Sequence, residues 1–228
     1  MSSGTPSKAD RFAAQQAERS GSLARQLDAL LALRGDERAL DVGSGTGALA
    51  FALAPRVREV VALDADPALA DRARSTAPAN VEVLVGDGES LPFDDDSFDL
   101  AATLRTLHHT PRPERLVAEL ARVVRAGGTI LVADQLAPAD PAAAADLNRF
   151  EIAREPSTTR ILSEDELRSL LAANGLVVQR EQIVREQREP GRYLDLAGCE
   201  GPERERALAF VPEGYEGVLG WFACGNAG

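Results

Sequence analysis

The stretch RALDVGSGTGALAFAL, residues 38–53, runs from an apolar segment through alternating glycines into a segment of helix-forming residues. This order is typical of a β-strand, a tight turn and a helix, with the turn placed close to a nucleotide-like ligand. Gly43, Gly45 and Ala48 also satisfy the dinucleotide pattern G-x-G-x-x-G/A. The glycines alone therefore leave two chemistries open, hydride transfer with a dinucleotide and group transfer with another cofactor.

Short apolar runs alternate with helical patterns on both sides of this stretch. The alternation predicts an open, mainly parallel sheet with helices on both faces. A capping box at Ser163 and Glu166 starts a later helix, which Asn174-Gly175 ends. The expected strands are residues 38–42, 59–64, 81–85, 98–103, 129–133, 176–186 and 215–225, and the expected helices are residues 46–54, 67–76, 113–125 and 163–173.

The length and composition favour a single acidic domain. The chain has 228 residues, 44% hydrophobic residues and a formal net charge of -11, which is a poor match for nucleic-acid phosphates. It contains no apolar run long enough to span a bilayer and no apolar signal-peptide core at its start. Cys199 and Cys224 lack metal-site spacing, so we expect free thiols, no metal and a cytoplasmic protein.

The ends of the chain carry weaker patterns than its centre. Residues 1–9 read as a flexible tail, and residues 10–228 as one domain without repeats or a long linker. Residues 10–33 look helical, with a Ser-Gly-Ser break at 20–22. Their leucines recur at helical spacing and are expected to pack on the domain: Leu23, Leu27, Leu30 and Leu31.

Acidic residues close three successive predicted strands. Asp41 lies two residues before Gly43, where it would repel a pyrophosphate and suit a ligand with an ammonium group. Asp64 is placed to accept hydrogen bonds from ribose hydroxyls, and Asp87 from the exocyclic amine of adenine. A ligand with a ribose, an adenine and a cationic tail satisfies all three acids, and S-adenosylmethionine is such a ligand.

Four ordered stretches carry a resemblance to a known family. They are ALDVGSGTGALA (39–50), VVALDADPALADRAR (60–74), VGDGESLPFDDDSFDLAATLRTLHHTPRP (85–113) and LARVVRAGGTILVAD (120–134). The chain resembles the class I S-adenosylmethionine-dependent methyltransferases, and within them the branch related to ubiquinone/menaquinone-biosynthesis C-methyltransferases. The resemblance implies a Rossmann-like, doubly wound α/β fold of three layers, whose seven-stranded sheet is mostly parallel with an antiparallel last strand.

The resemblance also implies residue roles. The core at 36–134 would bind S-adenosylmethionine and release S-adenosylhomocysteine, with residues 10–33 as a helical lid and residues 137–162 and 187–214 on the substrate side. The methionine part would be held by Asp41, Gly43, Ser44, Gly45 and Gly47, with Thr103 and Leu104 lining the same side; the ribose by Asp64; and the adenine by Ala65, Leu69, Asp87, Gly88 and Glu89.

The candidates for catalysis and substrate binding come from less regular segments. His108 and His109 follow the fourth predicted strand, and an imidazole there can serve as a general base, with His108 slightly favoured. The alternative is that both histidines only pack and cap the loop. Leu104 stands where many relatives carry Arg, and Thr158 where a common pattern carries His. The candidate substrate residues are Phe12, Phe150, Arg154 and Arg160, the arginines as partners of an anionic acceptor.

Three functional hypotheses remain at this point. The first is a methyltransferase that acts on a small-molecule acceptor as a monomer or homodimer, with no nucleic-acid partner and no membrane span. The second is an NAD-dependent oxidoreductase that uses the same glycine loop, which Asp41 and the 85–113 block disfavour. The third is a non-catalytic protein that binds S-adenosylmethionine, because a fold alone does not decide function.

Overall fold

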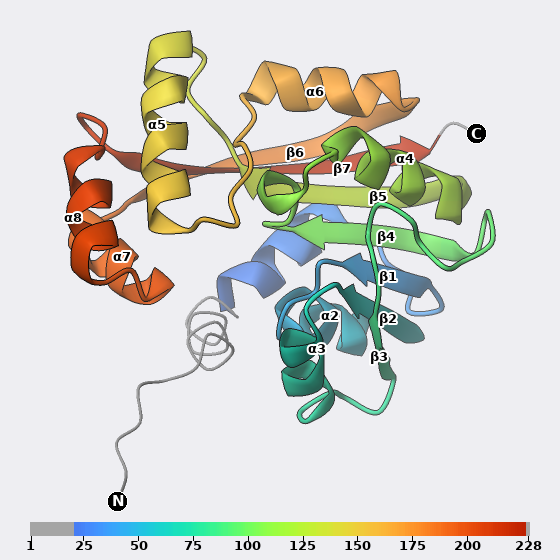
Figure 1. Ribbon diagram of the computed structural model, residues 1–228. Coiled ribbons are helices and arrows are strands. Elements are labelled where there is room, and N and C mark those ends of the chain that lie inside the picture. The colour runs from blue at the N-terminus through green and yellow to red at the C-terminus, as the bar shows by residue number, and fades with distance from the viewer. Residues whose placement is uncertain (1–20, 227–228) are drawn as a thin grey trace, which may run out of the picture.

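A computed structural model describes residues 21–226, and its centre is a seven-stranded sheet in the order β3-β2-β1-β4-β5-β7-β6 (Figure 1). The inserted strand β7 runs antiparallel to β5 and β6, and the pairs among β1 to β5 are parallel. This confirms the predicted doubly wound sheet. The strands are β1 (Arg38–Val42), β2 (Glu59–Asp64), β3 (Val81–Val85), β4 (Phe98–Leu104), β5 (Val124–Gln135), β6 (Leu176–Gln187) and β7 (Glu216–Asn226).

The helices begin where the chain supplies capping side chains. Asp66 and Asp140 each precede a proline, and the side chain of each accepts a backbone N–H from the first turn of its helix. Ser163 forms the predicted capping box with Glu166. The helices are α2 (Ala48–Leu53), α3 (Pro67–Arg74), α4 (Pro113–Val123), α5 (Pro141–Arg154), α6 (Glu164–Ala173), α7 (Pro190–Ala197) and α8 (Gly201–Ala209), with short 3-10 turns η1 (Ala54–Arg56) and η2 (Leu107–His109).

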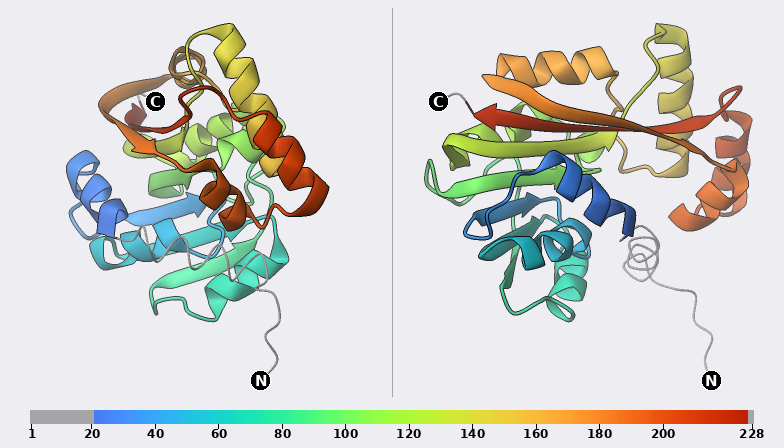
Figure 2. Two further views of the ribbon diagram at one scale, coloured as in Figure 1. Left: turned by 90° about the vertical axis from the view of Figure 1, so that its left-hand side faces the viewer. Right: turned by 180° about the vertical axis from the view of Figure 1, so that it is seen from behind.

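The sheet is covered on both faces, which gives the three layers. On one face, α2, α3 and the helical residues 21–30 share a core with the sheet, and the four leucines of the N-terminal segment are buried there as predicted. On the other face, α4 and α6 form a second core. Figure 2 shows both layers against the sheet. No helix among residues 21–226 is long and apolar enough to cross a bilayer.

A further group of helices lies beyond the carboxyl ends of the parallel strands, outside the three layers. There α5, α7 and α8 share an aromatic core around Phe150, Tyr193 and Tyr215 (Figure 1). The sequence patterns did not predict these helices within 137–162 and 187–214, because α5 is Ala-rich with no strong apolar stripe. Their position brings them next to the edge of the sheet where doubly wound folds bind ligands.

The strand boundaries differ most at β5. The structure ends α4 at Val123 and starts β5 at Val124, whereas the predicted helix ran to 125 and the predicted strand began at 129. A register shift between Phe98 and Leu100 lets β4 pair with this longer strand, with Phe98 opposite Val124. An irregular pairing of this kind depends on the neighbouring strand, so local periodicity does not reveal it.

Candidate functional site

The glycine loop between β1 and α2 turns at the carboxyl edge of the sheet. Gly43 and Gly47 have φ angles of 73° and 95°, a left-handed conformation that glycine adopts without strain. A Cβ atom at Gly43 would come within 2.3 Å of the Thr106 side chain, which follows β4. The loop backbone therefore packs directly against the chain that leaves the next strand, and the glycines make this approach possible.

Asp41 is a buried carboxylate beneath the loop. Its side chain is fully buried in β1, and Oδ2 accepts a hydrogen bond from the backbone N–H of Ala50 at 2.9 Å. Its Oδ1 has no partner among residues 21–226. Burial raises the pKa of Asp41 to about 7, against the lowering effect of the Ala50 hydrogen bond, and the nearby Asp64 adds to the rise. A cation or a hydrogen-bond donor at Oδ1 would offset the cost of this buried, unpaired oxygen.

Asp41 is one of the residues that line a cavity, which we call the loop cavity. Its lining includes Asp41, the predicted residues Gly43, Ser44, Gly45 and Leu104, and Trp221 of β7. The Ser44 hydroxyl and the Trp221 indole N–H are also buried without partners in the described part of the chain. Three residues that line this cavity thus carry a buried acceptor, a buried hydroxyl and a buried donor without partners in the described part of the chain. This set of groups suits a ligand that carries an ammonium and a carboxylate.

A second cavity adjoins the first across the glycine loop, and we call it the nucleoside cavity. It shares Gly43 and Gly45 with the loop cavity. Asp64 accepts the backbone N–H of Gly45 at 2.7 Å on Oδ2 and that of Asp66 at 2.9 Å on Oδ1. These bonds fix the carboxylate at the end of β2. The structure brings together here the residues predicted to hold ribose and adenine: Asp64, Ala65, Leu69, Asp87, Gly88 and Glu89.

The two acids after β3 differ in what they can still bind. Asp87 Oδ1 accepts the backbone N–H of Glu89 at 2.9 Å, which shapes the turn. The Glu89 carboxylate pairs with the Arg112 guanidinium at 2.5 Å and also accepts the Arg112 backbone N–H at 3.1 Å. Glu89 is therefore engaged by the protein, and an adenine edge would meet Asp87 and the backbone around Gly88.

Two residues predicted for the methionine side lie at the end of β4. Leu104 lines the loop cavity. Thr103 is buried, and its hydroxyl donates to the Val42 carbonyl at 2.9 Å, so it fastens β4 to β1 behind the cavity wall. The structure thus gives Thr103 a role in joining strands. Arg105, one place after Leu104, borders both cavities and adopts a left-handed φ of 57°.

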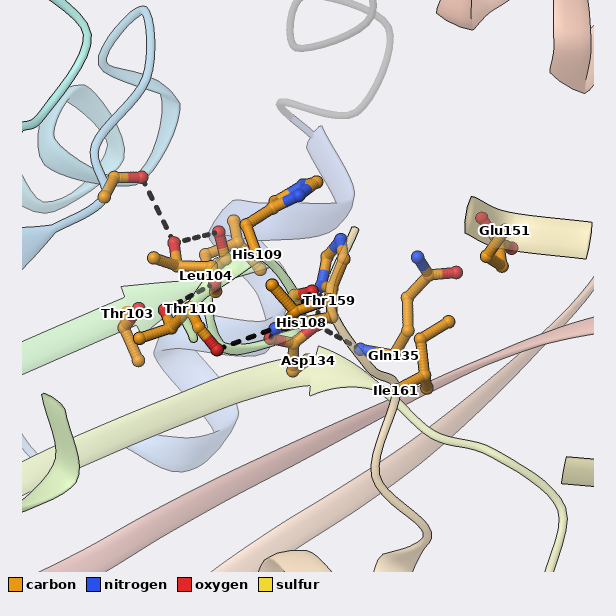
Figure 3. A network of polar contacts seen from close by, with 12 residues as sticks. Thr103, Leu104, His108, His109, Thr110, Asp134, Gln135, Glu151, Thr159 and Ile161 are labelled. Carbon is orange, nitrogen blue, oxygen red and sulfur yellow. Dashed lines mark hydrogen bonds and ion pairs between the residues drawn. The ribbon is translucent and has the colours of Figure 1, made fainter. Parts of the chain in front are cut away.

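His108 pairs with Asp134, the acid at the end of β5 (Figure 3). Nδ1 of His108 lies 2.5 Å from Oδ1 of Asp134, and the His108 backbone N–H donates to Oδ2 at 3.1 Å. Burial alone raises the pKa of Asp134, but the charge of His108 and several hydrogen bonds outweigh it and hold the pKa below its ordinary value. The carboxylate is therefore ionised and fixes the orientation of the imidazole.

His109 points differently, as expected for a neighbouring residue. It lines the nucleoside cavity, and its Nδ1 lies 3.2 Å from the Ser157 hydroxyl. Burial and the charge of His108 lower the pKa of His109 to about 4, so its ring is neutral near pH 7. Of the two candidate bases, His108 has the carboxylate partner that supports proton transfer.

The candidate substrate residues that the structure describes are buried or paired with carboxylates of the protein. Phe12 lies outside the described residues, and Phe150 is fully buried in the α5–α8 core. Arg154 is buried against Glu151 at 2.7 Å and Glu155 at 3.1 Å, while Arg160 pairs with Glu166. Both arginines thus have carboxylate partners within the protein, and their contact with an anionic acceptor stays a prediction.

The sequence interpretation missed two residues near the site. Asp134 closes the fifth predicted strand, so the strand-end rule that found Asp41 and Asp64 applied to it as well. Trp221, the only tryptophan of the chain, gave no local signal, because its position opposite Ala133 depends on how β7 inserts. Within residues 21–226, no cluster of three or more His, Cys, Asp or Glu side chains is arranged to hold a metal ion.

Known proteins share this arrangement. The family profile described as "Methyltransferase domain" matches residues 40–132. The uncharacterized methyltransferase YcgJ of Bacillus subtilis (strain 168) is 37% identical over 150 residues, 64% of this chain and 59% of YcgJ, so the chain spans under two thirds of that relative. Demethylmenaquinone methyltransferase of Clavibacter sepedonicus is 33% identical over 184 residues, 80% of this chain and 73% of the relative.

Solved structures agree with the sequence matches. BH2331 of Bacillus halodurans C-125 superposes with a TM-score of 0.85 at 25% identity, covering 91% of this chain and all of that one. The family profile extends well beyond the glycine loop, because its match runs from β1 into β5. Fold, site and relatives together place the chain in the class I S-adenosylmethionine-dependent methyltransferase family.

Proposed function

We propose that this protein transfers a methyl group from S-adenosylmethionine to a small-molecule acceptor by in-line displacement. The observation that carries the proposal is the buried, unpaired oxygen of Asp41, a residue that lines the loop cavity. S-adenosylmethionine has an ammonium and a carboxylate at one end and a ribose and an adenine at the other. The two adjoining cavities offer suitable polar groups for both ends.

Each part of the cofactor has candidate partners. Asp41 would pair with the ammonium, and the Ser44 hydroxyl and Trp221 N–H would serve the carboxylate. Asp64 would accept from the ribose hydroxyls, and Asp87 from the adenine amine. Bound in this way, the cofactor supplies a methyl carbon already activated by a positively charged sulfur.

The protein then has two tasks, alignment of the acceptor and removal of its proton. When the His108 ring is neutral, the contact of Nδ1 with Asp134 favours the tautomer with its proton on Nδ1, which leaves a lone pair on Nε2. Nε2 can therefore take a proton from the acceptor as it attacks. Alignment supplies several kcal/mol of the barrier, and a well-placed base contributes about 10²- to 10⁴-fold in rate.

Two other functions compete with this proposal. An NAD-dependent oxidoreductase would place a pyrophosphate beside the glycine loop, where the Asp41 carboxylate would repel it. A non-catalytic binder would keep the cofactor contacts without needing a base. The buried contact between His108 and Asp134 orients an imidazole, which an enzyme that removes a proton can use and a binder does not need, so it favours an enzyme.

Calorimetry tests the proposal directly. We expect S-adenosylmethionine and S-adenosylhomocysteine to bind the purified protein tightly and NAD not to bind. Incubation with methyl-labelled S-adenosylmethionine and a panel of hydroxyl, amine and thiol acceptors should then transfer label to at least one acceptor. Binding of NAD alone would overturn the proposal, and cofactor binding without transfer to any acceptor would favour the non-catalytic alternative.

A further inference from the structure

Two parts of the fold hold the backbone and the ring of His108. Asp134, in β5, contacts the imidazole at 2.5 Å and accepts the His108 backbone N–H at 3.1 Å. The His108 carbonyl accepts the backbone N–H groups of Thr159 at 2.7 Å and of Arg160 at 3.3 Å. The turn η2 that carries His108 has only three residues, so these outside contacts decide where the ring lies.

The side chain of Thr159 adds a further contact at the same carbonyl. Its hydroxyl oxygen lies 3.0 Å from the carbonyl oxygen of His108 and 3.1 Å from that of Thr110, the residue that follows η2. A hydroxyl has one proton, so Thr159 shares it between these two carbonyls. Figure 3 shows Thr159 beside His108. One threonine side chain thus fastens the backbone on the carboxyl side of the candidate base.

Thr159 belongs to the connection between α5 and α6, residues 155–163. At the start of this connection, α5 is anchored by Phe150 in the aromatic core that it shares with α7 and α8. Within the connection, Glu155 and Ser157 line the nucleoside cavity. The position of the candidate base therefore depends on the helices beyond the sheet edge as well as on the sheet.

We propose that Thr159 is a positioning residue for methyl transfer, which fixes the carbonyl of His108 and thereby the place of its Nε2. The inference rests on the proposed function, in which Nε2 takes the proton of the acceptor. Thr159 lines neither the loop cavity nor the nucleoside cavity, so it acts through His108. A base that is already in place needs no reorganisation when the acceptor arrives, and this lowers the barrier to proton removal.

The substitution Thr159→Val tests the inference, because it removes the hydroxyl and keeps the backbone N–H and the branched shape. Thr159 is exposed, so the variant should fold, and Thr159→Ala should behave in the same way if valine does not fit. NMR measures how fast the proton on Nδ1 of His108 exchanges with water. The chain has two histidines, so His109→Gln assigns the signal.

We expect this exchange to be about fivefold faster in Thr159→Val, the factor that one neutral hydrogen bond contributes. Thr159→Ser keeps the hydroxyl and should restore the wild-type rate. With an acceptor that takes label in the panel described above, Thr159→Val should lower kcat about tenfold and leave the KM for S-adenosylmethionine within about twofold. A loss of overall stability alone would not produce this separation of kcat from KM.

Thr158→Val is the matched control, because it makes the same change one residue earlier. The Thr158 hydroxyl is buried, and no group in the described part of the chain bonds to it. Thr158 also lines neither of the two cavities. This variant should keep the wild-type exchange rate and kcat, whereas a general loosening of the connection would change both variants alike.

The outcomes separate this inference from the proposed function. An unprotected Nδ1 proton in the wild type, an unchanged rate in Thr159→Val, equal acceleration in Thr158→Val or no rescue by serine would each overturn the inference. An unchanged kcat in Thr159→Val would do the same. Failure of the wild type to bind S-adenosylhomocysteine would instead overturn the proposed function, and the exchange of the imidazole proton does not depend on that result.

Discussion

Two buried carboxylates from two regions of the molecule have opposite surroundings. Asp41, beneath the glycine loop, has one backbone donor, one unpaired oxygen and a pKa raised to about 7 by burial. Glu151, in α5, is equally buried, but it receives Arg154 at 2.7 Å and the hydroxyls of Tyr193 and Tyr215 at 3.4 and 3.1 Å. The Asp41 carboxylate thus has one oxygen without a hydrogen-bond partner, whereas both oxygens of Glu151 have partners.

This difference indicates that the two carboxylates have different roles, one in ligand binding and the other in the stability of the fold. A buried charge that is fully paired holds its neighbours in place, and removal of one partner leaves the other uncompensated. A buried polar atom without a partner lowers the stability of the free protein and gains energy when a ligand completes it. We therefore expect changes at Asp41 to act on ligand affinity and changes at Glu151 to act on folding.

The largest effect is expected between these regions, at His108. His108→Gln should lower the rate of methyl transfer about 10²- to 10⁴-fold, because glutamine cannot take the acceptor proton. Cofactor affinity should stay within a few-fold, since the ring faces Asp134 and not the cofactor groups. Single-turnover kinetics and calorimetry measure the two effects. Near-normal turnover in this variant would remove His108 from the mechanism.

His109→Gln serves as the matched control for that variant. It makes the same change at the adjacent ring, which pairs with Ser157 and has a pKa lowered to about 4 by burial and by His108. A base with so low a pKa is a poor proton acceptor near pH 7, so its loss should reduce turnover by less than about tenfold.

The next effect is on stability, at Glu151. Glu151→Ala should lower the free energy of unfolding by about 3 kcal/mol or more, because it strips buried Arg154 of its nearest carboxylate. Urea denaturation measures this change. Asp146→Ala on the same helix removes a half-exposed carboxylate paired only with Arg149 and should cost about 0.5 kcal/mol or less. Equal losses in the two variants would contradict the comparison.

A smaller effect is expected at Asp41, and on a different property. Asp41→Asn should weaken S-adenosylhomocysteine binding about 10- to 100-fold, the loss of one hydrogen bond with a charged partner. Its unfolding free energy at pH 8 should stay equal or rise, because an amide can still accept the Ala50 N–H and avoids a buried charge.

Asp99→Asn is the control for Asp41. Asp99 belongs to β4 at the opposite edge of the sheet, where it accepts the Arg38 N–H at 2.7 Å and pairs with Arg125 at 2.7 Å. This variant should lose stability and keep its cofactor affinity. If Asp41→Asn behaved in the same way, Asp41 would be a structural residue and the unpaired oxygen would have no ligand.

The contrast also explains which parts of the molecule could be predicted from sequence. The strands, the glycine loop and the acids at Asp41, Asp64 and Asp87 follow from local periodicity and from the rule that parallel strands end at one edge. The placement of these acids around adjoining cavities agrees with that reasoning. The absence of a partner for Oδ1 of Asp41, by contrast, depends on how the folded chain packs around it, so the sequence does not reveal it.

The α5–α8 region was hard to predict for the converse reason. Its charges are paired through tertiary contacts, such as Arg160 with Glu166 and Glu151 with Tyr215, 64 positions apart. Sequence spacing does not reveal such pairs, so the arginines there looked available for a substrate. Arg154 and Glu151 are three positions apart, a spacing that predicts an ion pair on a helix. This prediction requires that the helix α5 itself be predicted first, and the sequence patterns did not predict it.

The smallest effect is a pH dependence that has opposite signs for binding and for stability. Because the pKa of Asp41 is raised to about 7 in the free protein, the carboxylate gains a proton as the pH falls from 8 to 6. The neutral acid attracts an ammonium less, so affinity for S-adenosylhomocysteine should fall about tenfold over this range. His109 stays neutral throughout, because its pKa is lowered to about 4.

Stability of the ligand-free protein should move the other way. A carboxyl whose pKa is higher in the folded than in the unfolded chain contributes stability at low pH and loses that contribution as the pH rises through 7. The wild type should therefore gain stability relative to Asp41→Asn between pH 8 and 5, while its affinity relative to that variant declines. Calorimetry and urea denaturation of both proteins across this range measure the two slopes. Slopes of the same sign would show that Asp41 does not face the ammonium, because only a residue that the ligand completes couples binding and folding to one proton in opposite directions.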